Sequence, residues 1–140
     1  MASEFTIKRS VEFSDTDMAG IVHFSNFFKY MEACEHAFVR SLGLSIVSKE
    51  TNPTIGWPRV AVSCEFKRAL RFEDEVEIHL KVAEKSSKAI TYSFAFRKVG
   101  EKEECARGSF TVVCCTFREG RMQATFIPAE FNERIEVAGG

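Results

Sequence analysis

Two acidic residues, a glycine and a histidine lie close together in the segment FSDTDMAGIVHFSN, which covers residues 13–26. Asp15, Asp17, Gly20 and His23 precede a predicted helix that begins near Phe24. Backbone N–H groups in the first turn of a helix lack intrahelical partners and lie at the positive end of its dipole. Such groups can polarise a carbonyl oxygen, and a nearby carboxylate can attack the carbonyl carbon or activate water. The segment therefore carries the residue types for chemistry at a carbonyl group.

The same spacing also fits a simpler interpretation. Asp15 and Asp17 are residue types that commonly stabilise turns through hydrogen bonds to nearby backbone groups. From spacing alone, turn formation is the more frequent outcome for acids on a loop. The elements around the segment must therefore be considered.

A change in apolar periodicity marks the helix that follows this segment. Residues 24–42 place apolar side chains on one helical face, with polar side chains largely elsewhere. Ser25 or Asn26 can cap the beginning of this helix, and Gly43 occupies the position where helices commonly end. The sequence predicts one long helix directly after the acidic segment.

Alternation of apolar and polar residues predicts strands on both sides of the helix. The predicted strands cover residues 5–13, 59–67, 75–82, 90–97, about 104–117, and 122–126. Residues 44–57 contain Asn52-Pro53 and Gly56-Trp57-Pro58, which are typical of an irregular loop. Short turns at 84–88 and 99–103 favour antiparallel neighbours. We predict an α+β fold, with an antiparallel sheet of five to six strands wrapped around one long central helix.

The same pattern bears on assembly. The strand over 104–117 is apolar on both faces near its end, which is typical of a central or covered strand. A sheet of this size with one helix usually needs a partner to protect its edges. We expect one domain over residues 1–140 that forms a homodimer or a homotetramer.

The composition of the 140-residue chain excludes several classes of protein. Hydrophobic residues make up 45% of the chain, enough to exclude an intrinsically disordered protein. With 19 Lys and Arg against 20 Asp and Glu, the net charge of −1 argues against a nucleic-acid or anionic-membrane partner. No apolar run approaches the ~18 residues that a membrane-spanning helix needs, and the first residues lack the pattern of a signal peptide.

Cysteine and phenylalanine are the two informative residue types in this composition. Five scattered cysteines without a Cys-x-x-Cys pair indicate free, buried thiols in a reducing cytoplasm. Fourteen phenylalanines beside one tryptophan and two tyrosines indicate an interior or interface rich in aromatic rings. We expect Phe38, Phe94 and Phe96 to pack in the core.

Residues 13–26 resemble the N-terminal signature of hotdog-fold acyl-CoA thioesterases of the 4-hydroxybenzoyl-CoA thioesterase family. The resemblance extends through FFKYME at 27–32 and Gly43-Leu44, and continues at FKRALRFEDEV over 66–76. It therefore covers nearly the whole chain. It implies a hotdog fold and hydrolysis of an acyl- or aryl-CoA thioester to free acid and CoA.

The resemblance assigns roles to individual residues. Asp17 matches the catalytic carboxylate of the family, and the backbone amide of Phe24 matches the group that polarises the thioester carbonyl. Asp15 matches an acid that shapes the turn, and Gly20 permits close backbone approach or a positive φ. Asp17 can act as a nucleophile or as a base that activates water, and both routes remain open.

The resemblance also places residues around the substrate. It implies that Trp57 lies by the acyl pocket, often across a subunit interface, and that Lys88 contacts the phosphates of CoA. Phe27 and Phe28, at the start of the helix, are expected near the carbonyl site, and Arg59 is a candidate for a basic rim around CoA. Lys67, Arg68 and Arg71 are further residues for a basic rim. Coenzyme A is then part of the substrate, and no cofactor is expected. An isolated surface lysine is more often simply solvated, and an aromatic residue is more often plain core.

Several positions depart from the family pattern or offer alternatives to it. Many relatives have histidine where this chain has Phe24, whereas here the histidine is His23, which either reaches the pocket or faces a subunit boundary. Relatives often have proline at the position of Ala69 and glycine at that of Glu73.

Two helix carboxylates remain in reserve. A related branch uses a carboxylate from the helix, which makes Glu32 and Glu35 reserve candidates against the simpler reading as solvated or interface charges. No spacing of His, Cys or Asp suggests a metal site. His36 and His79 are expected on the surface.

Two other classes of protein compete with a hydrolase. The first is a non-catalytic module that binds acyl-CoA or an acyl-carrier protein on the same fold, since fold alone does not determine function. The second is a hotdog dehydratase, which needs a His/Asp pair on a motif that this sequence lacks. The carboxylate at Asp17 discriminates between the hydrolase and the binding module.

Overall fold

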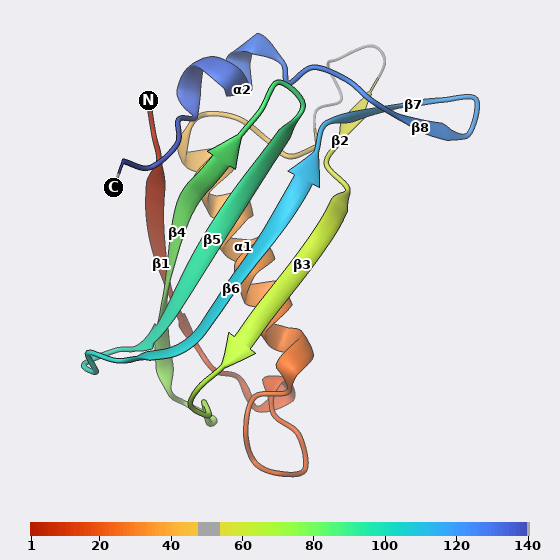
Figure 1. Cartoon of the computed structure of the whole chain (residues 1–140). Coiled ribbons are helices and arrows are strands. Elements are labelled where there is room, and N and C mark those ends of the chain that lie inside the picture. The colour runs from red at the N-terminus through yellow and green to blue at the C-terminus, as the bar shows by residue number, and fades with distance from the viewer. Residues whose placement is uncertain (48–53, 140) are drawn as a thin grey trace.

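The computed structural model describes residues 1–47 and 54–139, and its main feature is an antiparallel sheet that curves around one long helix (Figure 1). The helix α1 covers Phe24–Ser41. The five strands lie in the order β1 (Glu4–Ser10), β4 (Glu75–Lys85), β5 (Ala89–Lys98), β6 (Glu104–Val113) and β3 (Arg59–Phe66). Every neighbouring pair is antiparallel. The predicted combination of an antiparallel sheet and a single long helix is confirmed.

The two ends of α1 show how its sequence determines its length. The prediction that Ser25 or Asn26 caps the beginning was wrong, because His23 is the N-cap and its side chain accepts a hydrogen bond from the Ser25 backbone N–H. At the other end Gly43 has a φ of 78°, and the Leu44 N–H donates to the Val39 carbonyl at 3.2 Å. This closure of the last turn needs a left-handed residue after the helix, which glycine supplies as predicted.

The core lies between α1 and the inner face of the sheet. Met31, Cys34 and Phe38 on the helix are fully buried, as are Phe94 and Phe96 on β5. The expectation that Phe38, Phe94 and Phe96 pack in the core is confirmed. The helix approaches β6 closely at Gly108, where a Cβ atom would lie 2.8 Å from the sulfur of Met31. A side chain at that position would push the helix away from the sheet.

The strand β3 lies at an edge of the sheet and departs from the expected burial. Its alternating apolar residues include Val60, Val62 and Phe66, and their exposed fractions are 61%, 47% and 49%. Val62 pairs with the buried Phe110 of β6 and therefore lies on the helix side of the sheet. Its exposure shows that α1 covers this edge strand only in part.

The predicted final strands form a separate small sheet. The run over 104–117 is interrupted at Cys114, and the chain continues as β7 (Cys115–Arg118). β7 pairs with β8 (Arg121–Ala124) and with β2 (Ile55–Gly56), which lies within the segment predicted to be an irregular loop. Asn52 and Pro53 of that segment lie outside the described residues. Cys114 and Cys115, at the point where the chain passes from the main sheet to the small sheet, are both buried.

Two further features differ from the sequence prediction. The first strand ends at Ser10, and Phe13–Asp15 form a short 3-10 turn that leaves Phe13 exposed and in edge contact with Phe72. A short helix α2 (Ala129–Arg134), which was not predicted, buries Phe131 against Trp57. In the described part of the chain, no helix is both long enough and apolar enough to cross a membrane.

Candidate active site

The loop that carries Asp17 is a compact turn between the first strand and α1. The Asp17 N–H donates to the Ile21 carbonyl at 3.0 Å, and the Gly20 N–H donates to the Asp17 carbonyl at 2.9 Å. Thr16 and Val22 form an antiparallel bridge that closes the turn. Gly20 has a φ of 77°, so the expected positive φ is confirmed. An L-residue at this position would be strained, because only glycine adopts this conformation readily.

The Asp17 carboxylate is exposed and only partly occupied by hydrogen bonds. Its Oδ1 accepts from the Ala19 N–H at 2.8 Å, which fixes the orientation of the side chain. Among residues 1–47 and 54–139, no group donates to Oδ2. The Oδ2 atom of Asp17 is therefore available to contact a substrate or a water molecule.

The amide of Phe24 lies at the first position of α1. Its N–H has no hydrogen-bond partner in the described ranges, as expected for the first turn of a helix. The Phe24 side chain is 57% exposed and stacks on the ring of His23, with 4.6 Å between the centroids. An unpaired N–H at the positive end of a helix can polarise a carbonyl oxygen.

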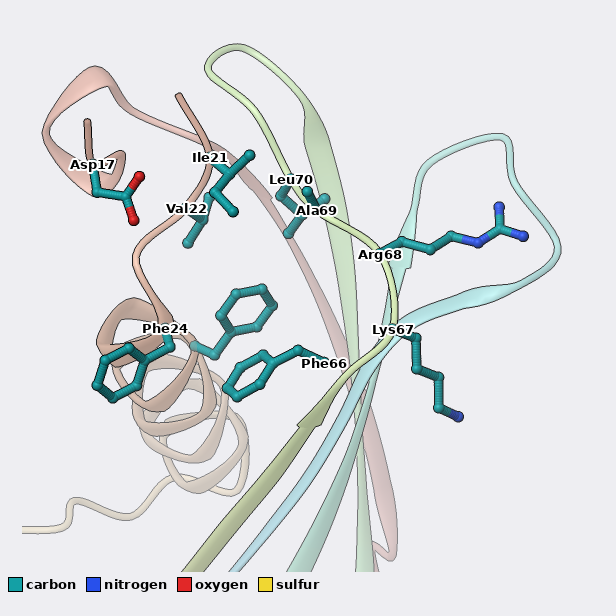
Figure 2. Close-up of a pocket in the computed structure, with 10 residues that line it drawn as sticks. Asp17, Ile21, Val22, Phe24, Phe66, Lys67, Arg68, Ala69 and Leu70 are labelled. Carbon is teal, nitrogen blue, oxygen red and sulfur yellow. The ribbon is translucent and has the colours of Figure 1, made fainter. Parts of the chain in front are cut away.

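A pocket of about 380 Å³ brings these two groups together (Figure 2). It lies between the Asp17 loop, the beginning of α1 and the connection from β3 to β4. Most of its lining is apolar, and Figure 2 shows the Lys67 and Arg68 side chains extending away from the Asp17 carboxylate. The lining residues are Asp17, Ile21, Val22, Phe24, Phe27, Phe66, Lys67, Arg68, Ala69 and Leu70.

The predicted site residues fall into two groups. Asp17, Phe24 and Phe27 line the pocket, and Gly20 and His23 lie in the loop beside it. His23 is engaged with Ser25, whose hydroxyl lies 2.8 Å from Nδ1, so the histidine acts in the helix cap. The half-buried Phe28 packs against the core and is not part of the lining.

The other predicted contacts are remote from this pocket within one chain. Trp57 is buried beside Phe131, Arg59 lies at the beginning of β3, and the Lys88 ammonium lies over the ring of Phe126 at 5.0 Å. In Figure 1 the beginning of β3 and the turn between β4 and β5 lie at the opposite end of the sheet from the beginning of α1. The basic rim residues Lys67 and Arg68 are paired with Glu104 and Glu103.

The two reserve carboxylates have different environments. Glu32 is exposed, but the side chain of Glu35 is fully buried and lies 2.5 Å from the Arg59 guanidinium. The simpler reading of Glu35 as a solvated charge was therefore wrong. Burial raises the pKa of Glu35 to about 7, although the nearby Arg59 acts in the opposite direction. In this chain Glu35 does not line the pocket.

Sequence reasoning missed several residues of this region. Ile21, Val22, Phe66 and Leu70 line the pocket, and their apolar character within the two family-like segments was the available signal. The polar group Tyr30, which contacts Asp15, had no signal of its own in the sequence. No group of three or more His, Cys, Asp or Glu residues suited to a metal ion is found in the described part of the chain.

Comparison with known proteins gives consistent matches over almost the entire chain. A model of the thioesterase-like superfamily matches residues 11–135. A protein of Aquifex aeolicus with a provisional esterase name is 33% identical over 132 residues, covering 94% of this chain and 98% of its own length.

Two solved structures extend the comparison. The structure of a gentisyl-coenzyme A thioesterase is 31% identical, with a TM-score of 0.79 over 91% of this chain and 99% of the other. A 4-hydroxybenzoyl-CoA thioesterase, solved as an Asp-to-Asn variant with 4-hydroxybenzoyl-CoA, superposes with a TM-score of 0.83. At 22% identity, over 94% of this chain and 98% of the other, the latter shows the shared hotdog fold alone.

Proposed function

The chain belongs to the thioesterase-like superfamily, and we propose that it hydrolyses an acyl- or aryl-CoA thioester to free acid and CoA. The observation that carries this proposal is the pocket in which the Asp17 carboxylate and the beginning of α1 meet. Within the described residues, one oxygen of the Asp17 carboxylate and the Phe24 amide have no hydrogen-bond partner, and attack on a thioester carbonyl uses two such groups.

The two groups have complementary roles in the proposed reaction. The thioester carbonyl oxygen accepts a hydrogen bond from the Phe24 N–H, which stabilises the negative charge that develops there. Asp17 then attacks the carbonyl carbon directly, with later hydrolysis of the anhydride, or removes a proton from an attacking water. Both routes break the bond between carbon and sulfur and release the thiol of CoA. CoA therefore enters as part of the substrate, and the reaction needs no cofactor.

The lining of the pocket favours an aromatic acyl group. Phe27 and Phe66 lie with their ring centroids 5.0 Å apart and nearly perpendicular, beside Val22 and Leu70. Aromatic rings prefer such edge-to-face neighbours. The solved relatives named for gentisyl-CoA and 4-hydroxybenzoyl-CoA act on aromatic thioesters, which supports the same class of substrate here.

We also propose that the protein works as a homo-oligomer, with β3 as the contact between two copies. The exposed apolar side chains of Val60, Val62 and Phe66 lie on this strand, which pairs with β6 and, among the described residues, has no second neighbour. Antiparallel pairing of two β3 strands would place the beginning of one strand beside the end of the other. The region of Trp57 and Arg59 in one copy would then approach the pocket of its partner.

The remaining parts of the proposal concern the surroundings of the protein. The five cysteines are free thiols, and burial raises the pKa of Cys105 and Cys114 to about 11. Unreactive free thiols are usual in a reducing compartment, which supports the cytoplasm as the place of action.

The proposed activity is tested by measuring release of thiol from a panel of CoA thioesters. The panel should include benzoyl-CoA, hydroxylated benzoyl-CoAs and straight-chain acyl-CoAs, and binding of each should be measured by calorimetry. We expect release of CoA, with the highest kcat/KM for aromatic thioesters. Binding of these compounds without thiol release would contradict the proposal and favour the non-catalytic binding module.

A further inference from the structure

Asp15, two residues before Asp17, connects the catalytic loop to α1 through both its side chain and its backbone. Its Oδ2 accepts hydrogen bonds from the Tyr30 hydroxyl at 2.8 Å and from the Glu12 N–H at 3.0 Å. Its carbonyl oxygen accepts from the His23 N–H at 2.9 Å and from the Asn26 Nδ2 at 2.8 Å. Three of these four donors belong to α1 or its N-cap.

Tyr30 is the most deeply buried of these donors. Its side chain is 2% exposed, and its ring packs near Phe27, with the Arg9 guanidinium 5.3 Å from the ring centroid. Burial and the Asp15 carboxylate both raise the pKa of Tyr30, so that its hydroxyl keeps its proton and donates. A hydrogen bond to a carboxylate is about twice as strong as one between neutral groups. The Tyr30 hydroxyl is therefore a buried donor that holds the Asp15 carboxylate in place through a hydrogen bond.

The Asp17 turn is closed mainly by bonds within itself. The bonds of Asp17 and Gly20 and the bridge between Thr16 and Val22 fix its shape, but they do not fix its position relative to α1. That position depends on the contacts of Asp15 and on the short link from Val22 to Phe24, whereas the Val22 N–H, which donates to the Leu70 carbonyl at 2.8 Å, holds the turn to the connection from β3 to β4. The Phe24 amide belongs to the helix, whereas the Asp17 carboxylate belongs to the turn.

We propose that Tyr30 is a positioning residue, whose hydroxyl acts through Asp15 to hold the Asp17 carboxylate at its working distance from the Phe24 amide. The inference rests on the proposed function and adds to it a residue that does not line the pocket. Small displacements of catalytic groups lower the rate steeply. Since Tyr30 does not contact the substrate, its loss should change kcat far more than KM.

The direct test is the variant Tyr30→Phe, which removes one oxygen atom and keeps the ring. We expect kcat to fall about tenfold or more, with KM within about twofold of the wild-type value. The matched control is Tyr92→Phe, since Tyr92 is equally buried but packs among the rings of Phe38, Phe94 and Phe110. The control should keep its kcat. An unchanged kcat in Tyr30→Phe, or equal losses in both variants, would overturn the proposal.

A second pair of variants tests the same contact from the other side and covers the case in which Tyr30→Phe does not fold. Asp15→Asn keeps an oxygen that accepts from Tyr30 and Glu12, whereas Asp15→Ala removes it. We expect Asp15→Asn to keep most of the kcat that Asp15→Ala loses. Equal kcat values in the two variants would contradict a role for this hydrogen bond.

Amide hydrogen exchange provides a readout that does not depend on activity. The N–H groups of Glu12 and His23, which donate to the side chain and to the carbonyl oxygen of Asp15, should exchange faster in Tyr30→Phe than in the wild type or in Tyr92→Phe, because Asp15 is less firmly held. Unchanged exchange would overturn the positioning role even if the wild type hydrolysed none of the thioesters. Absence of hydrolysis together with faster exchange would instead contradict the proposed function, but it would still support the role of Tyr30 in holding Asp15 and the turn that carries Asp17.

Discussion

At the scale of single residues, the same chemical group has different consequences in different environments. Asp17 and Glu35 are both carboxylates, but Asp17 is exposed, with one oxygen that accepts no hydrogen bond from the described part of the chain, whereas the Glu35 side chain is fully buried. The difference follows from position, because Asp17 lies on a loop before the helix and Glu35 lies on the buried helical face. Asp17 is therefore suited to chemistry, whereas Glu35 is suited to a structural role with Arg59.

The buried carboxyl of Glu35 predicts a characteristic dependence of stability on pH. Its pKa is raised to about 7 in the folded protein, above the ordinary value of 4.5, so the folded state binds the proton more tightly than the unfolded state. The contribution of Glu35 to the free energy of unfolding is therefore fully present below about pH 4.5 and is lost as the pH rises toward 7. Replacement by Gln removes this titration.

The measurement is denaturant unfolding of the wild type and Glu35→Gln at several pH values between 4.5 and 7.5. The stability of the wild type relative to Glu35→Gln should decrease as the pH rises, because other titrating groups cancel in the difference. Glu32→Gln is the control, since Glu32 also contacts Arg59 but is exposed. A difference that does not change with pH, or that increases with pH, would contradict this account.

At the scale of elements, turns with a left-handed residue determine how helices and strands are joined. Gly20 and Gly43 flank α1 with positive φ values, and Glu73, two residues before the beginning of β4, has a φ of 71°. The Glu73 N–H donates to the Val11 carbonyl, which holds the turn against the end of the first strand. Relatives of the family often have glycine at this position, and this chain keeps the left-handed conformation with a residue that is strained in it.

Glu73→Gly is therefore expected to stabilise the protein. Relief of the left-handed strain should raise the free energy of unfolding by about 1 kcal/mol, after the larger entropy of glycine in the unfolded chain is subtracted. Glu73→Ala is the control, because it removes the carboxylate but keeps the Cβ atom that causes the strain. Denaturant unfolding measures both values, and an equal effect of Ala and Gly would show that the carboxylate, rather than the backbone, determines the outcome.

The elements also show how far the sequence could predict this structure. Periodicity predicted α1 and the strands of the main sheet, because the apolar residues of each recur with a regular spacing. It missed α2 and β2, which are too short for a period to be recognised, and it continued the last strand through the turn at Cys114. These short elements are positioned by tertiary contacts such as Trp57 on Phe131, and a local pattern does not contain such contacts.

Prediction of the candidate site had a similar limit. The motif predicted Asp17, the helix start and the positive φ of Gly20, because these features are local in the sequence. It could not predict that Tyr30 contacts Asp15 or that Arg59 pairs with Glu35, since these depend on how α1 meets the loop and the edge strand. The contacts expected from Trp57, Arg59 and Lys88 remain predictions, because within one chain these residues lie away from the pocket.

At the scale of the whole molecule, the uncovered edge of the sheet connects the fold to the proposed assembly. α1 covers most of the inner side of the sheet but leaves part of β3 exposed, with Val62 at the centre of the strand. An exposed apolar edge strand tends to pair with a strand of another chain. A second copy would pair with the backbone N–H and C=O groups at the edge of β3 and would bury the apolar side chains of this strand at the same time.

Val62→Asp should therefore shift the protein toward the monomer. A buried, unpaired carboxylate at the contact costs several kcal/mol, which raises the dissociation constant about a hundredfold or more. Light scattering after size-exclusion chromatography measures the mass of each variant over a range of concentrations. The control is Val99→Asp, since Val99 is also exposed but lies after β5 in a turn. A wild-type monomer at all concentrations, or an oligomer unaffected by Val62→Asp, would contradict the assembly through β3.

The central claim is that the Asp17 carboxylate performs the chemistry in the pocket at the beginning of α1. Its most direct test is the turnover of the best aromatic CoA thioester by Asp17→Asn, a variant of nearly identical shape. We predict that kcat falls about a hundredfold or more, while the far-ultraviolet spectrum and the melting temperature stay close to wild type. Glu130→Gln, which removes an exposed carboxylate on α2, should keep its full kcat. Near-normal turnover by a folded Asp17→Asn enzyme would contradict the account.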